Sequence, residues 1–200
     1  MSREKILREY IRELIQESHF PLPYAVKDED EVRRIHHSRA GSRVEDVPQA
    51  SGFTQQVGRK PNGLWYECQD GSKMDWKTFC DTGLSTKYSK RYDSTYNVVL
   101  DEYLILFIPD THYFDKFASV PKPGKPSGFR GAYGIPHPAF PRNPKENLIN
   151  WPKVAEHYSG IEICPYIGKR REVTWYYGWD VASGCIWSQQ GIQELRKIKC

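Results

Sequence analysis

The 200-residue chain contains no run of about 18 apolar residues, so no transmembrane helix is expected. Its N-terminal stretch, MSREKILREYIRELIQE, is charged throughout and lacks the apolar core of a secretion signal, which predicts a cytoplasmic protein. No GxGxxG motif follows a predicted strand and no P-loop is present. The sequence therefore does not support a Rossmann or P-loop mode of nucleotide binding.

The cysteines are few and lack a metal-binding pattern. They form no CxxC pair and no Cys/His cluster at zinc spacing, and their number is odd: Cys68, Cys80, Cys164, Cys185 and Cys200. In a chain without a secretion signal, this pattern predicts free thiols rather than disulfides, and no metal site. Cys164 and Cys185 lie in apolar runs, where we expect them in the core.

The composition indicates a globular domain with many turns. Hydrophobic residues make up 38% of the chain and aromatic residues 14%, so much of the core must come from large rings. The 15 glycines and 14 prolines favour turns and long loops over a helical bundle. The formal net charge of +4 permits an anionic partner but does not require nucleic acid.

Periodicity predicts an α+β fold of short strands and short helices. Residues 1–22 are expected to form an extension with an amphipathic helix over 3–17, and residues 23–200 a single domain. Residues 96–109 predict two strands joined by a turn, or one strand with a bulge, and 189–200 a polar tail of weak helical character. We further expect strands at 32–41, 160–166, 173–181 and 183–188, and helices at 73–81, 110–118 and 150–158.

Glu162 is a single carboxylate within the apolar run GIEICPY. Because side chains alternate along a strand, Ile161 and Ile163 share one face and Glu162 takes the other. Glu162 then either faces solvent on a half-exposed sheet or faces a cleft. In a cleft of low effective dielectric, a carboxylate stabilises a developing positive charge.

Two further segments contain candidate binding residues. In RIHHSR, His36 and His37 are adjacent on a predicted strand, so one faces each side, and a structural role is as consistent with the pattern as contact with a ribose or phosphate. In GLWYE, Gly63 permits close approach of a backbone or a ligand, and Trp65 and Tyr66 face opposite sides. One of these rings is expected in the core, and the other can stack on a flat heterocycle.

In this order, IHHSR, KPNGLWYE, VVLDEYLILFI, HYSGIEICPY and WYYGWDVASGCIW resemble NAD-dependent mono-ADP-ribosyltransferase-like proteins, of a type found among bacterial toxins and phage proteins. The resemblance covers roughly residues 32–188. It implies a split of two small, mostly antiparallel sheets, NAD as co-substrate, and a protein or nucleic-acid acceptor. The implied roles are catalysis by Glu162, ribose binding by His36 or His37, nicotinamide binding by Gly63, Leu64, Trp65 and Tyr66, and pyrophosphate binding by Arg39 or Lys60.

The sequence departs from one branch of that family. Arginine-modifying members carry a second glutamate two residues before the catalytic one, where this chain has Gly160. A histidine on the first strand is similar to the other branch, which modifies other protein residues or nucleic acids. Two alternatives remain. One is a non-enzymatic nucleic-acid- or protein-binding module, and the other is a glycoside hydrolase with Asp180 or Asp101 as a second carboxylate.

Overall fold

The computed structural model describes residues 32–39, 53–69, 75–83, 92–119 and 133–198. The predicted N-terminal helix and its extension, residues 1–22, lie outside the described residues. None of the helices in the described ranges is long and apolar enough to span a membrane.

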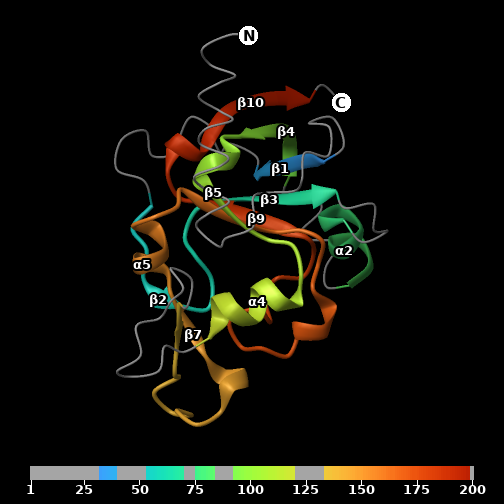
Figure 1. The fold of residues 1–200 in the computed structure, drawn as a ribbon. Coiled ribbons are helices and arrows are strands. Elements are labelled where there is room, and N and C mark those ends of the chain that lie inside the picture. Colours follow the sequence, from blue (N-terminus) through green and yellow to red (C-terminus); the bar gives the residue numbers. More distant parts are fainter. Residues whose placement is uncertain (1–31, 40–52, 70–74, 84–91, 120–132, 199–200) are drawn as a thin grey trace.

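Seven strands form the main sheet, and their spatial order differs from their order in the chain (Figure 1). All neighbouring pairs are antiparallel except β5 and β8, which are parallel. From one edge to the other the strands are β10 (Ile192–Ile198), β4 (Tyr92–Leu100), β1 (Arg33–Arg39), β3 (Leu64–Gln69), β9 (Ser183–Ile186), β8 (Gly160–Ile163) and β5 (Ile105–Ile108).

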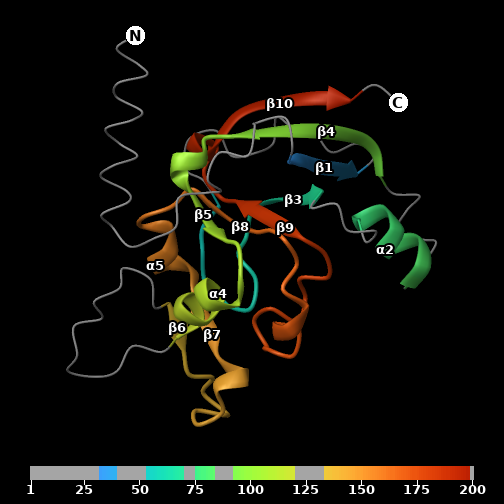
Figure 2. The same ribbon diagram turned by 45° about the vertical axis from the view of Figure 1, so that its right-hand side comes forward.

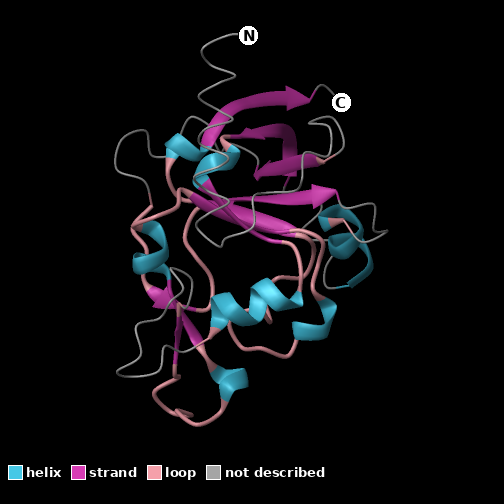
Figure 3. Ribbon diagram, viewed as in Figure 1, coloured by secondary structure: helices cyan, strands magenta, loops and turns pink. Residues whose placement is uncertain are grey.

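A second, antiparallel sheet has three short strands in the order β2 (Val57–Gly58), β7 (Leu148–Asn150) and β6 (Gly134–Ile135). The helices are short: α2 (Trp76–Gly83), α4 (Thr111–Ala118) and α5 (Trp151–Ala155), with 3-10 turns η2 (Glu102–Leu104), η3 (Pro144–Glu146), η4 (Gly168–Arg170) and η5 (Gln189–Gly191). The α+β class is thus confirmed (Figure 3). The two sheets are mostly antiparallel, as expected, but the larger one is not small, since it has seven strands and includes one parallel pair.

The main sheet packs a core on each of its faces. In Figure 2, β10, β4 and β1 arch above β3 and β9, while α4, α5 and the small sheet lie below. The inner core joins Val98 and Leu100 of β4 to Leu64 of β3 and Phe107 of β5, so the sheet curls until strands that are far apart in its order make contact. The other face packs against a larger cluster rich in aromatic residues, which includes Phe114, Phe117, Trp151, Trp175, Tyr176, Trp179 and Trp187.

Most predicted elements are present. β4 and β5 form two strands separated by η2, as one of the two interpretations of residues 96–109 required. Asp110 and Asn150 cap α4 and α5 by accepting hydrogen bonds from backbone N–H groups of their first turns. Residues 73–81 contain a helix, although α2 begins at Trp76.

Two predictions of local structure are wrong. Residues 173–181 form successive turns instead of a strand, with Tyr176 N–H donating to the Val173 carbonyl and Trp179 N–H to the Tyr176 carbonyl. The turns let Trp175, Tyr176 and Trp179 all face the same aromatic core, an arrangement that an alternating strand would prevent.

The predicted polar tail contains strand β10, which pairs with β4. A shift of register between Ile192 and Glu194 interrupts the alternation of the strand. The half-buried residues of β10 are therefore Ile192, Leu195 and Ile198, three residues apart. That spacing imitates a helix, which explains why the sequence pattern was misleading.

Candidate functional site

Glu162 belongs to a row of residues that crosses three strands on the inner face of the sheet. Tyr66 of β3 lies opposite Gly184 of β9, and Gly184 lies opposite Glu162 of β8. A Cβ atom on Gly184 would overlap the Tyr66 ring. The glycine therefore allows the phenol to cross β9 and donate a hydrogen bond of 2.9 Å from its Oη to Glu162 Oε2.

The carboxylate of Glu162 is fully buried and paired with a guanidinium from a distant strand. Arg34 of β1 donates from Nε to Glu162 Oε2 at 2.6 Å and from Nη2 to Oε1 at 3.3 Å. Nη2 also donates to Glu102 Oε1 at 3.1 Å. Glu162 thus faces neither solvent nor an open cleft, and the interpretation of β8 as half-exposed is wrong.

Burial and pairing shift the ionisation of this cluster. Burial by itself would lower the pKa of Arg34, but the charge of Glu162 and the hydrogen bonds to it raise that pKa above its ordinary range. Burial raises the pKa of the Tyr66 hydroxyl, and the neighbouring Glu162 raises it further. Tyr66 therefore stays a neutral hydrogen-bond donor, and Arg34 stays charged.

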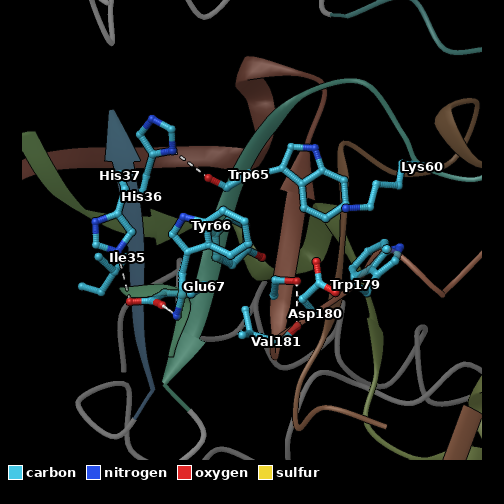
Figure 4. Close-up of a pocket in the computed structure, with 13 residues that line it drawn as sticks. Ile35, His36, His37, Lys60, Trp65, Tyr66, Glu67, Trp179, Asp180 and Val181 are labelled. Atoms are coloured by element: carbon cyan, nitrogen blue, oxygen red, sulfur yellow. Dashed lines mark hydrogen bonds and ion pairs between the residues drawn. The ribbon is translucent and has the colours of Figure 1, made fainter. Parts of the chain in front are cut away.

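A cavity of about 280 Å³ lies beside β1 and β3, next to the 178–181 segment (Figure 4). We call it the strand pocket. Its lining residues come from four separate parts of the chain, and they are Ile35, His36, His37, Lys60, Trp65, Tyr66, Glu67, Trp76, Gly178, Trp179, Asp180, Val181 and Ser183. Trp65 and Glu67 alternate with Tyr66 along β3, so their side chains project from the face opposite to the one that holds Glu162.

The two histidines point to opposite sides of β1, as Figure 4 shows. His37 Nε2 donates to Glu67 Oε1 at 3.2 Å, and Glu67 Oε2 accepts the backbone N–H of Trp76 at the start of α2. His36 Nδ1 donates instead to the Trp65 carbonyl at 2.6 Å. Burial lowers the pKa of His36, although that hydrogen bond partly opposes the shift. His37 is thus the histidine that shares a face with Trp65 and Glu67.

One wall of the strand pocket combines aromatic rings with charged groups. The Trp65 ring packs edge-on against Trp179 with centroids 4.8 Å apart, and Lys60 Nζ lies 4.8 Å from the Trp65 centroid. The protein around Lys60 displaces water and lowers its pKa, an effect that the Asp180 carboxylate partly opposes. This wall offers a flat apolar surface beside one carboxylate and one ammonium.

The structure places five of the predicted site residues at one cavity: His36, His37, Lys60, Trp65 and Tyr66. Gly63 does permit a close approach, but the approaching group is the backbone of Ile186, with no room there for a ligand. Leu64 is buried in the inner core, and Arg39 ends β1 with a side chain outside the described part of the structure.

Sequence reasoning missed Glu67 and Trp76 as pocket residues and named Asp180 only as a second carboxylate for the glycoside hydrolase alternative. Glu67 had a signal, because it lies two residues after Trp65 on the same strand and must share its face. Trp76 and Asp180 had none, since their positions depend on how α2 and the 173–181 turns pack.

The prediction that all the cysteines are free is wrong. Cys68 at the end of β3 and Cys164 just after β8 form a disulfide between buried residues 96 positions apart in the chain. Their sulfur atoms and a Glu162 oxygen lie within 4.8 Å of one another. Bonded sulfurs are not thiolates and the carboxylate is already held by Arg34, so this group does not form a metal site in the state seen here. Cys80 and Cys185 are free and buried, and burial raises the pKa of the Cys185 thiol.

Comparisons with protein-family models, with curated proteins and with solved structures found no match. A functional assignment for this chain therefore depends on its own residues and their geometry.

Proposed function

We propose that the chain is an NAD-dependent mono-ADP-ribosyltransferase of the ADP-ribosyltransferase-like fold and that it binds the nicotinamide end of NAD in the strand pocket. The observation that carries the proposal is the convergence of His37, Trp65 and Asp180 on one cavity from three separate segments. An indole face and a carboxylate suit nicotinamide, which is a flat ring with a positive charge while it is attached to ribose.

Trp65 supplies the ring surface for nicotinamide in this proposal. His37 is held by Glu67, which in turn caps α2, so its imidazole has a fixed orientation from which it can bond a ribose hydroxyl. Lys60, beside the Trp65 ring, is the cation available for the pyrophosphate.

In the reaction, the bond between ribose C1′ and the nicotinamide nitrogen breaks, and its electron pair leaves with neutral nicotinamide. Positive charge develops on the ribose ring. A nucleophilic oxygen or nitrogen of the acceptor then bonds to C1′ and releases its proton to a carboxylate or to water. A carboxylate beside the ribose stabilises the charged stage, and one such contact is worth about 3–4 kcal/mol, or roughly 10²–10³ in rate.

Asp180 is our candidate for that carboxylate, because it lines the strand pocket. Glu162, which the sequence resemblance favours, does not line the pocket and is neutralised by Arg34. Glu162 holds the Tyr66 hydroxyl, and Tyr66 forms part of the pocket wall. In this proposal Glu162 is a positioning residue that acts through Tyr66.

The test is release of nicotinamide from NAD by the purified wild type and by Asp180→Asn, Trp65→Ala and Glu156→Gln. Glu156 is an exposed acid at the end of α5 and does not line the pocket, so it is the matched control. We expect Asp180→Asn to lower kcat by about 10²–10³ with an unchanged urea midpoint. Trp65→Ala should mainly raise KM.

Full turnover in Asp180→Asn would overturn the assignment of the carboxylate. No turnover by the wild type, together with no NAD binding by calorimetry, would overturn the proposed function. It would then favour the non-enzymatic binding module.

A further inference from the structure

A second cavity, of about 540 Å³, lies between α4, the 136–147 segment and η4. We call it the basic pocket. Four of its lining residues are cationic and two are acidic: Arg142, Lys145, Lys169 and Arg170 against Asp115 and Glu172. The wall therefore has a net charge of +2, counted as four positive minus two negative side chains.

Two of the four cations are already paired. Arg170 donates to both oxygens of Asp115, and Lys145 Nζ lies 2.8 Å from Glu172 Oε2. Arg142 and Lys169 have no acidic partner among the residues that the structure describes, and both are exposed. Their charge is available to an anion, and two cations on one cavity wall suit neighbouring phosphates.

Exposed aromatic rings accompany this charge. Phe140 is 55% exposed and lies two residues before Arg142, and Tyr177 is 66% exposed and lies four residues after Val173 of the basic pocket wall. An exposed aromatic ring offers a face on which a nucleic-acid base can stack. Cations interleaved with such rings are typical of single-stranded nucleic-acid sites, where phosphates meet cations and bases stack on rings.

The basic pocket and the strand pocket share one segment of chain. Val173 lines the first and Gly178 lines the second, with Tyr177 beside Gly178. Five residues of extended chain span at most about 18 Å, and this segment is coiled into turns. A short segment, in which Tyr177 is the exposed residue, therefore joins the wall of the basic pocket to that of the strand pocket.

We infer that the basic pocket and Tyr177 form a binding track for single-stranded nucleic acid, which delivers a nucleotide to the strand pocket as the acceptor of ADP-ribose. This inference rests on the proposed function, since it names the class of acceptor. The binding part is tested without NAD, so its failure is distinguishable from failure of the transfer chemistry.

The experiment measures fluorescence anisotropy of a labelled 15-nucleotide single strand, as DNA and as RNA, with the full chain at 50 and 200 mM salt. Each phosphate contact to a single strand contributes about 0.7 to the slope of log Kd against log salt, or about 2.6-fold over this range. Between 50 and 200 mM salt, the Kd of the double variant Arg142→Gln/Lys169→Gln should therefore rise by a factor about sevenfold smaller than the Kd of the wild type does.

Matched variants distinguish binding at the track from a general effect of positive charge on the protein surface. Lys197 is exposed on β10, which lies at the far edge of the main sheet in Figure 1, so Lys197→Gln should change Kd much less than Lys169→Gln. Tyr177→Ala should weaken binding about fivefold or more, and Tyr177→Phe should restore it because the ring remains. Equal effects of Lys169→Gln and Lys197→Gln, or no binding by the wild type, would overturn the inference.

A final arm adds labelled NAD to wild type with the oligonucleotide and, separately, with cell protein. Label on the oligonucleotide that disappears in Lys169→Gln supports the acceptor class, and the DNA and RNA arms show which strand is used. Label on protein alone overturns it. Track-dependent binding without any NAD turnover would support the nucleic-acid surface and count against the proposed function.

Discussion

The strongest prediction concerns Glu162→Gln, which removes one negative charge from the centre of the molecule. Glu162 is 0% exposed, and Arg34, its partner, is 8% exposed. The substitution keeps the size of the side chain but leaves the guanidinium with only Glu102, whose side chain is 45% exposed. Because Arg34 keeps its charge, the protein cannot relieve the mismatch by losing a proton.

We expect a loss of about 3–5 kcal/mol in the free energy of unfolding, the usual cost of breaking a buried ion pair from one side. The Tyr66 hydroxyl can still donate to the new amide oxygen, which keeps the loss within that range. Arg34→Met should be similarly costly, because it leaves the Glu162 carboxylate buried without its cation. The double variant should lose much less than the sum of the two, since no unpaired charge remains.

The assay is urea unfolding at pH 7 of the wild type, both single variants and the double variant. Glu172→Gln is the control, because it breaks the exposed pair with Lys145 and should leave the midpoint unchanged. A Glu162→Gln protein within about 1 kcal/mol of wild type would refute the argument from buried charge. A stable Glu162→Gln protein with lowered NAD turnover would instead support the positioning role of Glu162 through Tyr66.

Three further predictions follow from the packing and ionisation. Gly184→Ala should lower the free energy of unfolding by about 1–3 kcal/mol, measured by urea titration, because the new methyl group would overlap the Tyr66 ring; an unchanged midpoint would show that the ring can move aside. His36 has a lowered pKa in the folded protein, so the unfolded chain binds the proton more readily and the free energy of unfolding should fall as the pH drops below about 6.5. Thermal melts from pH 7.5 to 5.5 should show a falling melting temperature in the wild type and a smaller fall in His36→Gln. Equal falls in the two proteins would contradict the prediction. Cys68→Ser should lower the free energy of unfolding by about 2–4 kcal/mol and make the melting temperature insensitive to reducing agent. A wild-type melting temperature that does not change with reducing agent would argue against the Cys68–Cys164 bond.

Local patterns were enough to predict several elements and part of the site. The side chains of Asp110 and Asn150 accept hydrogen bonds from backbone N–H groups three residues further along the chain. The local sequence therefore contains all the information that starts α4 and α5. The sequence named His36 with His37 and Trp65 with Tyr66 as pairs of candidates, and the strand pairing shows that His37 shares a face with Trp65 and Glu67. Alternation also predicted correctly that Glu162 and its isoleucine neighbours occupy different faces of β8, since Ile161 and Ile163 pack in the aromatic cluster and Glu162 contacts Tyr66 of the inner core.

The sequence by itself determined the α+β class, the main strands and the residue types available for chemistry, because these depend on composition and on spacing over a few residues. Only the tertiary structure decided which residues cover each face of the main sheet. The curl of the sheet encloses Glu162 with Arg34, which is 128 residues away in the chain, and the aromatic core pulls residues 173–181 into turns that bring Asp180 to the strand pocket. Such contacts join segments far apart in the chain, so no local pattern contains them.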